Sequence, residues 1–563
     1  MTDPGGGNPS CYTACSSISP VSFYSSIIQV SHCLKSLHQL SIFFFSAAIL
    51  SVLPMSLPPP KHESTDTHSQ HIQYSDSLSH APISDTEHVF LVTWDGPDDP
   101  ENPQNWPLLK KVCASIAPLS VIFAVSFASS SFGPCDSYVS AEYSISAEVT
   151  KLGVALFIAG YAVGPLVFAP MAELFGNVPP LLIALIGCGA FQIPLALAKN
   201  SVTIFVSRFL AGVLGSAALA VGSGLLADFY SSIARGAAIA VTACFMNLGS
   251  VISPIAAAYI SERYGWRWTA WANLIVIGVS SVISGFLLCE SSHNRILMLR
   301  AARLRVETKN DKLRAHSELH ALDLKVLIKL HFTKPIRMFV QEPILILITV
   351  YLTLVYGTLY LSYQFFTQNF QNRGWGASTS TLCLAPVGVG VITATVIIAT
   401  YSLTYYKTRQ IELSNSMAQG ESISSARLSP EMRLPPMMLG SVILPPALLW
   451  FGWSGNVQWA CQIISCFFVG CSLQLIFTSG IIYIIDVYMG HTVSAISIHV
   501  VVRSLASATF PMFELPMYDR LGISWSSTLL ACISFLIMAC PFLMWNFGAR
   551  VRSWSQFSVD DEM

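Results

Sequence analysis

The sequence predicts an all-α integral membrane protein with twelve transmembrane helices in two six-helix bundles. Hydrophobic residues make up 53% of its 563 residues and charged residues only 11%, whereas soluble domains carry about 25% charged residues. The mean hydropathy is +0.57. The apolar residues form continuous runs of about 20, the length that an α-helix needs to cross a bilayer. Continuous rather than alternating runs exclude a membrane barrel.

Twelve runs meet this length, and they fall into two groups of six, roughly 106–290 and 343–548. The expected spans of the first group are Val112–Phe132, Leu152–Met171, Pro179–Ala198, Val202–Ala227, Gly236–Ile260 and Trp268–Cys289. Those of the second group are Pro343–Phe366, Thr379–Tyr401, Leu434–Trp453, Trp459–Ile485, Val493–Met512 and Trp525–Phe547. Two hydrophobic halves joined by a polar segment are typical of transporters built from repeats.

The segment 291–342 separates the two halves and has a helix-forming composition with mixed charges. We expect a solvated cytoplasmic linker helix there. Twenty of the 30 Lys and Arg residues fall in segments on the side of this linker and of both termini, and six fall on the other side. This bias predicts that both termini are cytoplasmic.

Residues 1–105 are expected to form a disordered cytoplasmic N-terminal tail, and residues 549–563 a cytoplasmic C-terminal tail. The apolar run Ile42–Leu53 is too short to span a membrane, and it follows about 40 residues rather than the short basic start of a signal peptide. The composition changes at Met55 to a hydrophilic, Ser- and Pro-rich stretch. We therefore expect Met55 to be the true start and residues 1–54 to come from an overextended gene model.

Several motifs follow one another along the chain in a specific order. They are LVTWDGPDDPENPQNWPLLKK before the first span, FASSSFGPC at its end, LGVALFIAGYAVGPLVFAPMAELFG in the second, SRFLAGVLGSAALAVGSGLLADFY in the fourth, ERYGWRWTAW at the sixth, EPILILITVYLTLVYGTLYL in the seventh and RLPPMMLGSVILP at the ninth. This series resembles the fungal drug:proton antiporters of the major facilitator superfamily, over about residues 91–557.

The resemblance implies the major facilitator fold, in which two pseudo-symmetric bundles rock around a central site to give alternating access. It also implies multidrug efflux, the export of small amphipathic molecules such as drugs, fungicides or secondary metabolites, by proton antiport. A polyamine or nutrient carrier, or a degenerate member that senses a ligand without transporting it, are the alternatives. No P-loop, HExxH or GxSxG motif is present, so an enzyme is not expected.

Arg208 lies in the otherwise apolar fourth span. A charge inside the membrane costs at least about 2.5 kcal/mol by insertion scales, so its side chain should face the protein interior or water. It matches the Arg of the RFxxG motif that the family ties to proton coupling, which makes it the candidate for that role. A structural Arg bound to backbone carbonyls is the alternative.

Glu173 and Gly176 after the second span, and Asp228 at the end of the fourth, match positions of the family's cytoplasmic gate, as does Asp486 in the second half. The chain departs from the family here, because Asn177 and its neighbour replace a basic pair. We expect Asp228 to lack its usual cationic partner, which weakens the gate, and Asp486 to cap or pair locally. A solvated loop without a gating role is the alternative.

The seventh span carries tyrosines at steps of four and three, Tyr356, Tyr360 and Tyr363. Together with Gln364 they form an aromatic, hydrogen-bonding face that suits a central cavity, although packing between helices is equally compatible. Gln364 stands where the family commonly has Glu, so a titratable carboxylate is missing. The fifth span, GSVISPIAAAYI, has likewise lost most of the Gly-Pro motif of the antiporters.

His499 and Arg503 of the eleventh span are four residues apart and share a helix face. They are candidates for the central cavity, with a proton relay or a satisfied polar contact as the two interpretations of His499. Glu514 lies just beyond them, and we expect an exposed charge at the rim, with a compensating titratable acid as the alternative. Asn247 in the fifth span is expected to form a hydrogen bond between helices, with the cavity wall as the alternative that makes it a further candidate.

Most of the 14 cysteines lie in apolar stretches, so neither a metal site nor disulfides are expected. No cofactor is predicted. The net charge of −1 gives no indication of nucleic-acid binding. The expected partners are a small-molecule substrate, protons and the lipid bilayer, and the expected assembly is a monomer. The plasma membrane is the first expectation for its location and the vacuolar membrane the second.

Overall fold

The computed structural model describes residues 90–96, 98–315, 318, 324–418, 428–455, 458–555 and 557. Within these ranges, twelve helices are long and apolar enough to cross a membrane, in agreement with the twelve predicted spans. The expectations about Met55 and about the run Ile42–Leu53 concern residues outside the described ranges.

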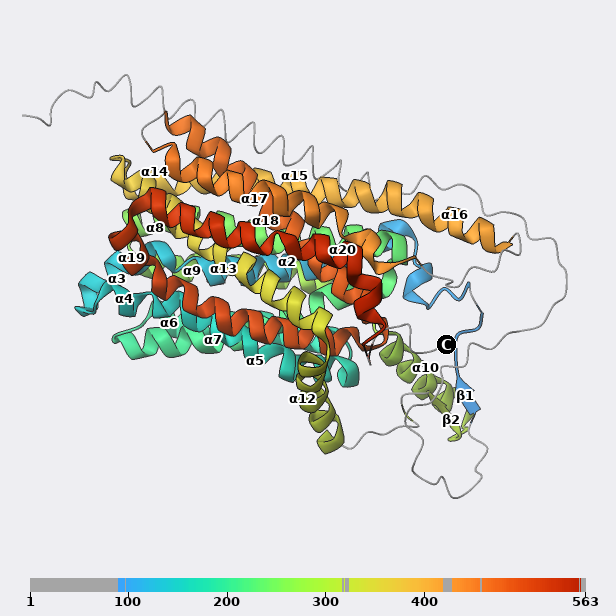
Figure 1. Cartoon of the computed structure of the whole chain (residues 1–563). Helices are drawn as coiled ribbons and strands as arrows, with labels where there is room; N and C mark the ends of the chain where they lie inside the picture. Colours follow the sequence, from blue (N-terminus) through green and yellow to red (C-terminus); the bar gives the residue numbers. More distant parts are fainter. Residues whose placement is uncertain are drawn as a thin grey trace, which may run out of the picture. The chain divides into compact units, whose positions relative to one another are not determined.

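The first half is built around α7, which packs against α5, α6 and α2 (Figure 1). Asn200 begins α7 by accepting a hydrogen bond from the amide of Thr203, which satisfies one free N–H of the first turn. The elements are α2 Leu108–Ser130, continued by η2 Gly133–Cys135 and α3 Asp136–Tyr143; α4 Ala147–Thr150 and α5 Leu152–Phe175; α6 Val178–Ala196; α7 Ser201–Phe229; α8 Ser232–Tyr264; and α9 Arg267–Leu287.

The second half has α18 at its centre, packed against α17, α15 and α13. Its last two spans are continuous in α19, which turns at Gly522, where φ is 69°. Only glycine adopts this backbone region freely. The elements are α13 Pro343–Asn372; α14 Ala377–Ser380, η3 Thr381–Leu384 and α15 Ala385–Tyr401; η4 Ser402–Tyr406 and α16 Lys407–Ala418; η5 Pro430–Arg433 and α17 Pro435–Trp453; α18 Trp459–Val487; η6 Met489–His491 and α19 Thr492–Ile537; and α20 Ala539–Arg552.

The segment between the halves contributes α10 His293–Thr308, β2 Leu313–Ala315 and α12 Leu324–Gln341, which gather at one end of the spanning helices (Figure 1). We call this the linker end and the opposite one the far end. Residues 90–105, expected as part of a disordered tail, form β1 Phe90–Val92 and η1 Pro103–Asn105 instead. Strand β1 pairs in parallel with β2, so this part of the tail is fixed to the linker.

An ion-pair cluster reinforces this strand pair. Arg300 of α10 pairs with Asp95 and, at 2.6 Å, with Asp99. The Asp99 carboxylate also accepts hydrogen bonds from the amides of Asp95 and Glu101. These amide bonds and the Arg300 guanidinium lower the pKa of Asp99 to about 2. The pair therefore stays ionised at neutral and mildly acidic pH, and it weakens only as the pH falls from 3.8 to about 2.

We predict that Arg300→Ala releases residues 90–105 from the linker, because Asp99 then loses its only ion-pair partner among the described residues. Hydrogen exchange of this segment should rise several-fold, because the local protection that the ion pair supplies is lost. Arg303→Ala is the matched control, since the Arg303 side chain is 61% exposed and reaches only Glu101. Equal exchange in both variants would contradict a role for the ion pair.

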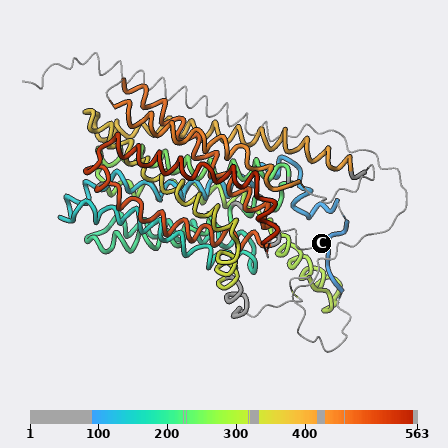
Figure 2. Tube along the Cα trace, viewed as in Figure 1, coloured from blue at the N-terminus to red at the C-terminus, as the bar shows by residue number. Residues whose placement is uncertain are grey.

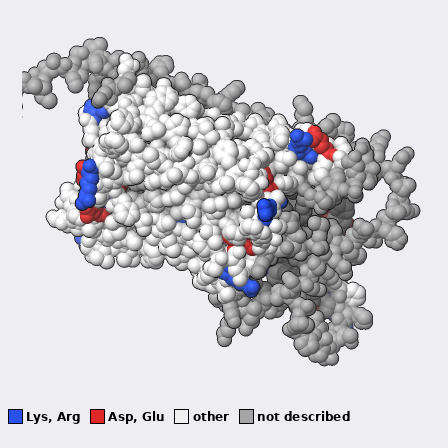
Figure 3. Space-filling model, viewed as in Figure 1, with Lys and Arg blue, Asp and Glu red and all other residues white. Residues whose placement is uncertain are grey.

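The surface of the spanning helices is apolar. In Figure 3 the charged side chains gather toward the two ends of the molecule, and the face between them is largely free of charge. Single apolar side chains of the spanning helices are strongly exposed, such as Phe286 at 85%, Leu536 at 76% and Ile186 at 71%. Large apolar side chains exposed in this number are stable in lipid rather than in water.

A close crossing between the second and the fourth span occurs in both halves. A Cβ on Gly212 of α7 would meet the carbonyl oxygen of Phe157 of α5, and a Cβ on Gly160 of α5 would lie 2.7 Å from the carbonyl oxygen of Phe209. In the second half, Gly390 of α15 and Gly470 of α18 meet each other's backbone in the same way. Small residues thus bring the two helix backbones into contact within each half.

The contact between the halves is made differently. Helix α5 packs against α19, and α8 packs against α15 (Figure 2). Glycines at this boundary face side chains instead of backbone: a Cβ on Gly388 of α15 would lie 3.4 Å from a methyl group of Val251, and one on Gly236 of α8 would lie 2.8 Å from the Arg433 guanidinium. Backbone-to-backbone contacts of glycine thus occur within each half, whereas these two boundary glycines meet side chains of the other half.

We predict that Gly212→Ala destabilises the first half, because the added Cβ has no space beside the α5 backbone. Backbone shifts forced by such overpacking cost about 1–3 kcal/mol. Thermal unfolding of the purified protein should therefore occur at a lower temperature. Gly224→Ala on the same helix is the control, since a Cβ there meets nothing within 4 Å. An unchanged melting temperature for Gly212→Ala would contradict the crossing.

Candidate functional site

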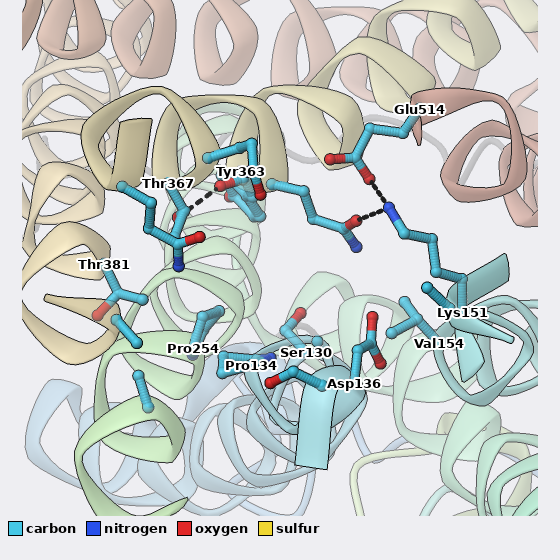
Figure 4. A pocket seen from close by; sticks show the side chains of 18 of the residues that line it. Ser130, Pro134, Asp136, Lys151, Val154, Pro254, Tyr363, Thr367, Thr381 and Glu514 are labelled. Carbon is cyan, nitrogen blue, oxygen red and sulfur yellow. Dashed lines mark hydrogen bonds and ion pairs between the residues drawn. The ribbon is translucent and has the colours of Figure 1, made fainter. Parts of the chain in front are cut away.

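A cavity of about 290 Å³ lies between the two halves, near the far end of the spanning helices (Figure 4). The first half contributes Ser130 to Tyr138, the start of α5 and two residues of α8, and the second half contributes α13, η3 and α19. The side chains in its wall that carry chemistry are Asp136, Lys151, Tyr360, Tyr363, Gln364 and Glu514.

A buried ion pair crosses this cavity from one half to the other. Lys151, directly before α5, lies 2.5 Å from Glu514 of α19 and donates a second hydrogen bond of 3.0 Å to Gln364 of α13. The side chains of Lys151 and Glu514 are only 8% and 7% exposed. The expectation that Glu514 is an exposed rim charge is therefore wrong, because α5 and α19 pack together and enclose it.

Asp136, the first residue of α3, faces the same cavity from the first half (Figure 4). Its Oδ1 atom is buried and has no hydrogen-bond partner among the described residues. The charges of Lys151, Glu514 and Arg208 all act on it. A buried carboxylate oxygen without a partner is uncommon, because desolvation is then uncompensated. This oxygen is therefore a place where a proton or a ligand donor can bind.

Two of the six cavity candidates, Tyr360 and Gln364, line the cavity. Tyr356 does not; it lies one helical turn away and its hydroxyl is 3.2 Å from that of Tyr360. Tyr363, also in the wall, has a buried hydroxyl without a partner among the described residues. The tyrosine face of α13 is thus shared between the cavity and the helix packing beneath it.

Arg503 and His499 lie outside the cavity wall, buried at 2% and 1% exposure. The Arg503 guanidinium stacks over the ring of Tyr356 at 4.2 Å and over that of Phe477 at 5.0 Å. This contact is a cation–π interaction. Nδ1 of His499 lies 3.4 Å from the Thr349 hydroxyl, which is a satisfied polar contact on that side of the ring.

Asn247 is also absent from the cavity wall. Its amide donates a 2.5 Å hydrogen bond to Gln474 of α18, and Gln474 donates in turn to Thr395 of α15 at 3.2 Å. This chain of hydrogen bonds connects the first half to the second within the apolar interior. It gives each of these three polar side chains a hydrogen-bond partner in a region where neither water nor lipid could supply one.

Arg208 is completely buried, and its guanidinium is fully engaged by backbone. It donates to the carbonyl oxygens of Gly153 at 2.8 Å, Ala128 at 2.6 Å and Ser129 at 2.5 Å. Its charge also lies 4.4 Å from the centre of the Phe157 ring. Arg208 thus connects α7 to the end of α2 and the start of α5. This is the geometry expected of a structural Arg bound to backbone carbonyls rather than of a proton-coupling residue.

At the linker end, the gate residues of the first half form a polar cluster. The Asn177 side chain donates to Asp228 at 2.8 Å, and Ser291 donates to the same oxygen at 3.0 Å. Burial raises the pKa of Asp228 to about 7, because these two hydrogen bonds and the charge of Arg235 offset only part of the desolvation. Asn177 thus replaces the expected cationic partner with a neutral donor.

Glu290 completes this cluster, and the sequence did not indicate it. Its carboxylate accepts from the amides of Asn177 and Ser291 at 3.0 and 3.1 Å, at the start of α6 and before α10. A carboxylate is favourable at helix N-termini. Gly176 has φ of 90°, and a Cβ there would collide with the Glu290 carboxylate, so only glycine fits this position.

At the equivalent place in the second half, the linker end of α18, an ion pair takes the place of the polar cluster. Asp486 at the end of α18 pairs with Arg433 at 2.8 Å, and the Arg433 guanidinium stacks on Tyr406 at 3.5 Å. Glu173 acts electrostatically on Lys334 of α12, whose ammonium lies 3.0 Å from Nδ1 of His491. Helix α12 therefore bridges the end of α5 and the start of α19, and it holds the two halves together at the linker end.

Three residues of the cavity, Asp136, Lys151 and Glu514, were not among the predicted site residues. A charged residue just outside a predicted span is normally assigned to a solvent-exposed loop. The first span continues through η2 into α3, however, over Leu108–Tyr143, and this places Asp136 within the packed region. The sequence signal for this was the stretch that continues helically beyond the expected end of the first span at Phe132.

Comparison with known proteins assigns this architecture. The profile of the Major Facilitator Superfamily matches residues 119–511. The chain belongs to this superfamily. It is therefore a secondary transporter and an integral, multi-pass membrane protein, not an enzyme, and members of the superfamily bind small-molecule substrates.

Similar proteins come from fungi. The MFS-type transporter traF of Penicillium crustosum is 37% identical over 489 residues, which cover 86% of this chain and 96% of the relative. The citrinin biosynthesis cluster MFS transporter mrr1 of Monascus ruber is 34% identical, covering 84% and 93%. The solved proton:xylose symporter XylE shares the fold, with a TM-score of 0.53 at 15% identity over 78% of this chain and 95% of that one.

We predict that Arg208→Lys loses stability, because a single ammonium group cannot reproduce the three diverging bonds of the guanidinium. Each buried carbonyl left unpaired costs about 1–3 kcal/mol. The melting temperature of the purified protein measures this. The control Arg263→Lys changes an exposed residue at the end of α8 and should be neutral. A variant with normal stability would mean that Arg208 is not a fastening residue.

Proposed function

We propose that this carrier exports small amphipathic molecules, namely secondary metabolites, drugs or fungicides, in exchange for protons by alternating access. The observation that carries this proposal is the cavity between the halves, lined by tyrosines and by three ionisable side chains. Aromatic walls with a few polar groups suit flat amphipathic ligands. Ionisable groups in the same cavity supply a place where proton and ligand compete.

The proposed orientation places the linker end and both termini in the cytoplasm, in accordance with the bias of Lys and Arg. The cavity then lies toward the extracellular side. The contacts of α12 with α5 and α19 close the cytoplasmic side. We further propose a monomer in the plasma membrane. The relative named for a citrinin biosynthesis cluster supports a secondary metabolite as the class of substrate.

The proposal predicts that cells expressing the chain accumulate less substrate. We would express it in a yeast strain deficient in efflux and measure intracellular levels of citrinin and of a panel of labelled drugs. Accumulation of at least one compound should fall on expression and recover when a protonophore removes the proton gradient. Surface labelling controls for delivery to the plasma membrane.

Three results would contradict this proposal. A compound whose accumulation falls but does not respond to the protonophore would exclude proton antiport for that compound. A compound whose accumulation rises on expression would indicate uptake, as for a polyamine or nutrient carrier. Binding of a compound without any flux would indicate a ligand sensor.

A further inference from the structure

The cavity contains two carboxylates and one ammonium group in close proximity. Lys151 and Asp136 belong to the first half, and Glu514 belongs to the second. The ammonium group of Lys151 donates hydrogen bonds to Glu514 at 2.5 Å and to Gln364 at 3.0 Å. Asp136 is thus left without an ion-pair partner within 4 Å among the described residues. One negative charge in this site is not neutralised.

This arrangement depends on how closely the halves approach each other. The Lys151–Glu514 pair joins α5 to α19, so it exists only while these helices are packed together at the far end. While the pair is formed, water is excluded from both side chains, which are 8% and 7% exposed. Asp136 is then half-buried, and its Oδ1 atom is enclosed without a hydrogen-bond partner among the described residues. An ionised carboxylate in that state is costly.

We propose that Asp136 is the group that carries the exchanged proton, and that the Lys151–Glu514 pair makes this proton a condition for closing the far end. With a proton on Asp136, the three side chains sum to zero charge. The proton comes from water at the open far end, binds the free carboxylate oxygen, and leaves to water when the linker end opens. A ligand with an N–H or O–H donor, above all a protonated amine, occupies the same oxygen in the opposite step.

The other charged groups around Asp136 do not provide a substitute. Arg208 of α7 acts on it electrostatically, but its three donor groups are already bound to backbone carbonyls. Lys151 is held by the second half. Glu514 carries the same charge as Asp136 and adds repulsion. A proton or a ligand donor remains as the compensating partner, and the two exclude each other as antiport requires.

This inference rests on the proposed proton antiport, but it is testable without any substrate. We would reconstitute the full-length chain in lipid and record infrared difference spectra between acidic and neutral pH. A protonated carboxyl group shows its own C=O stretch, which disappears on ionisation. Asp136→Asn should remove one such band, and Asp136→Glu should keep it at a shifted frequency. Asp519→Asn, an exposed residue near the same end, should leave it unchanged.

A spectrum of Asp136→Asn identical to the wild type would overturn the assignment, as would loss of the band in Glu514→Gln alone. Size-exclusion chromatography of each variant checks that it is folded. Asp136→Glu, which keeps the carboxyl group, provides the second test if the Asn variant does not fold.

Transport supplies the second readout, with citrinin as the probe in proteoliposomes. The wild type should accumulate the probe against its gradient when a proton gradient is imposed. Asp136→Asn should reduce this accumulation ratio to about one while it retains exchange of labelled for unlabelled probe. If the wild type shows no proton-driven transport, the proposed function fails for this probe, whereas the infrared spectra still decide the role of Asp136. If the wild type and Asp136→Asn pump equally, the inference fails alone.

Discussion

A charge inside a membrane protein must find its partners within the protein, because lipid offers none. Arg208 meets this constraint by donating to three backbone carbonyls, and in doing so it ties α7 to α2 and α5. Lys151 meets it with a carboxylate on the other half. The first arrangement cannot change without unfolding the bundle. The second joins one half to the other, so it would break if the halves separated at the far end.

The two halves share one architecture but differ in the chemistry of their linker-end corners. Both use a glycine crossing between their second and fourth spans, Gly160 with Gly212 and Gly390 with Gly470. The second half closes its corner with the ion pair of Arg433 and Asp486. The first half uses the neutral donor Asn177 beside Asp228. A neutral donor binds a carboxylate less strongly than a guanidinium does, so the first half has the weaker closure.

The fold was predictable from the sequence because continuous apolar runs of spanning length have few structural solutions in lipid. All twelve spans lie where hydropathy placed them. The site was predictable only in part. Tyr360 and Gln364 line the cavity, but Asn247, Arg503 and His499 are used in contacts beneath it.

The remainder of the site depends on tertiary contacts between residues far apart in the chain. Lys151 and Glu514 are 363 positions apart, and no local pattern indicates that they meet. The sequence around residues 90–105 likewise has the composition of a polar tail. Its order depends on Arg300 of the linker, which pairs with Asp95 and Asp99 in the folded structure. Periodicity identifies which segments are buried, whereas pairing between distant polar residues requires the assembled structure.

The contrast between backbone contacts within each half and side-chain contacts between the halves has a consequence for evolution. A Cβ on a glycine that touches the neighbouring backbone forces that backbone to shift, so replacements inside each bundle carry a cost in stability. At the boundary, a Cβ on Gly388 would lie 3.4 Å from a methyl group of Val251, which is an ordinary van der Waals distance, so a small side chain fits there. Relatives should therefore diversify in speed and selectivity along α8 and α15, while the two bundles themselves drift slowly. New transport properties would then arise from changes at the boundary between the two halves, without changes to the helix crossings inside each half.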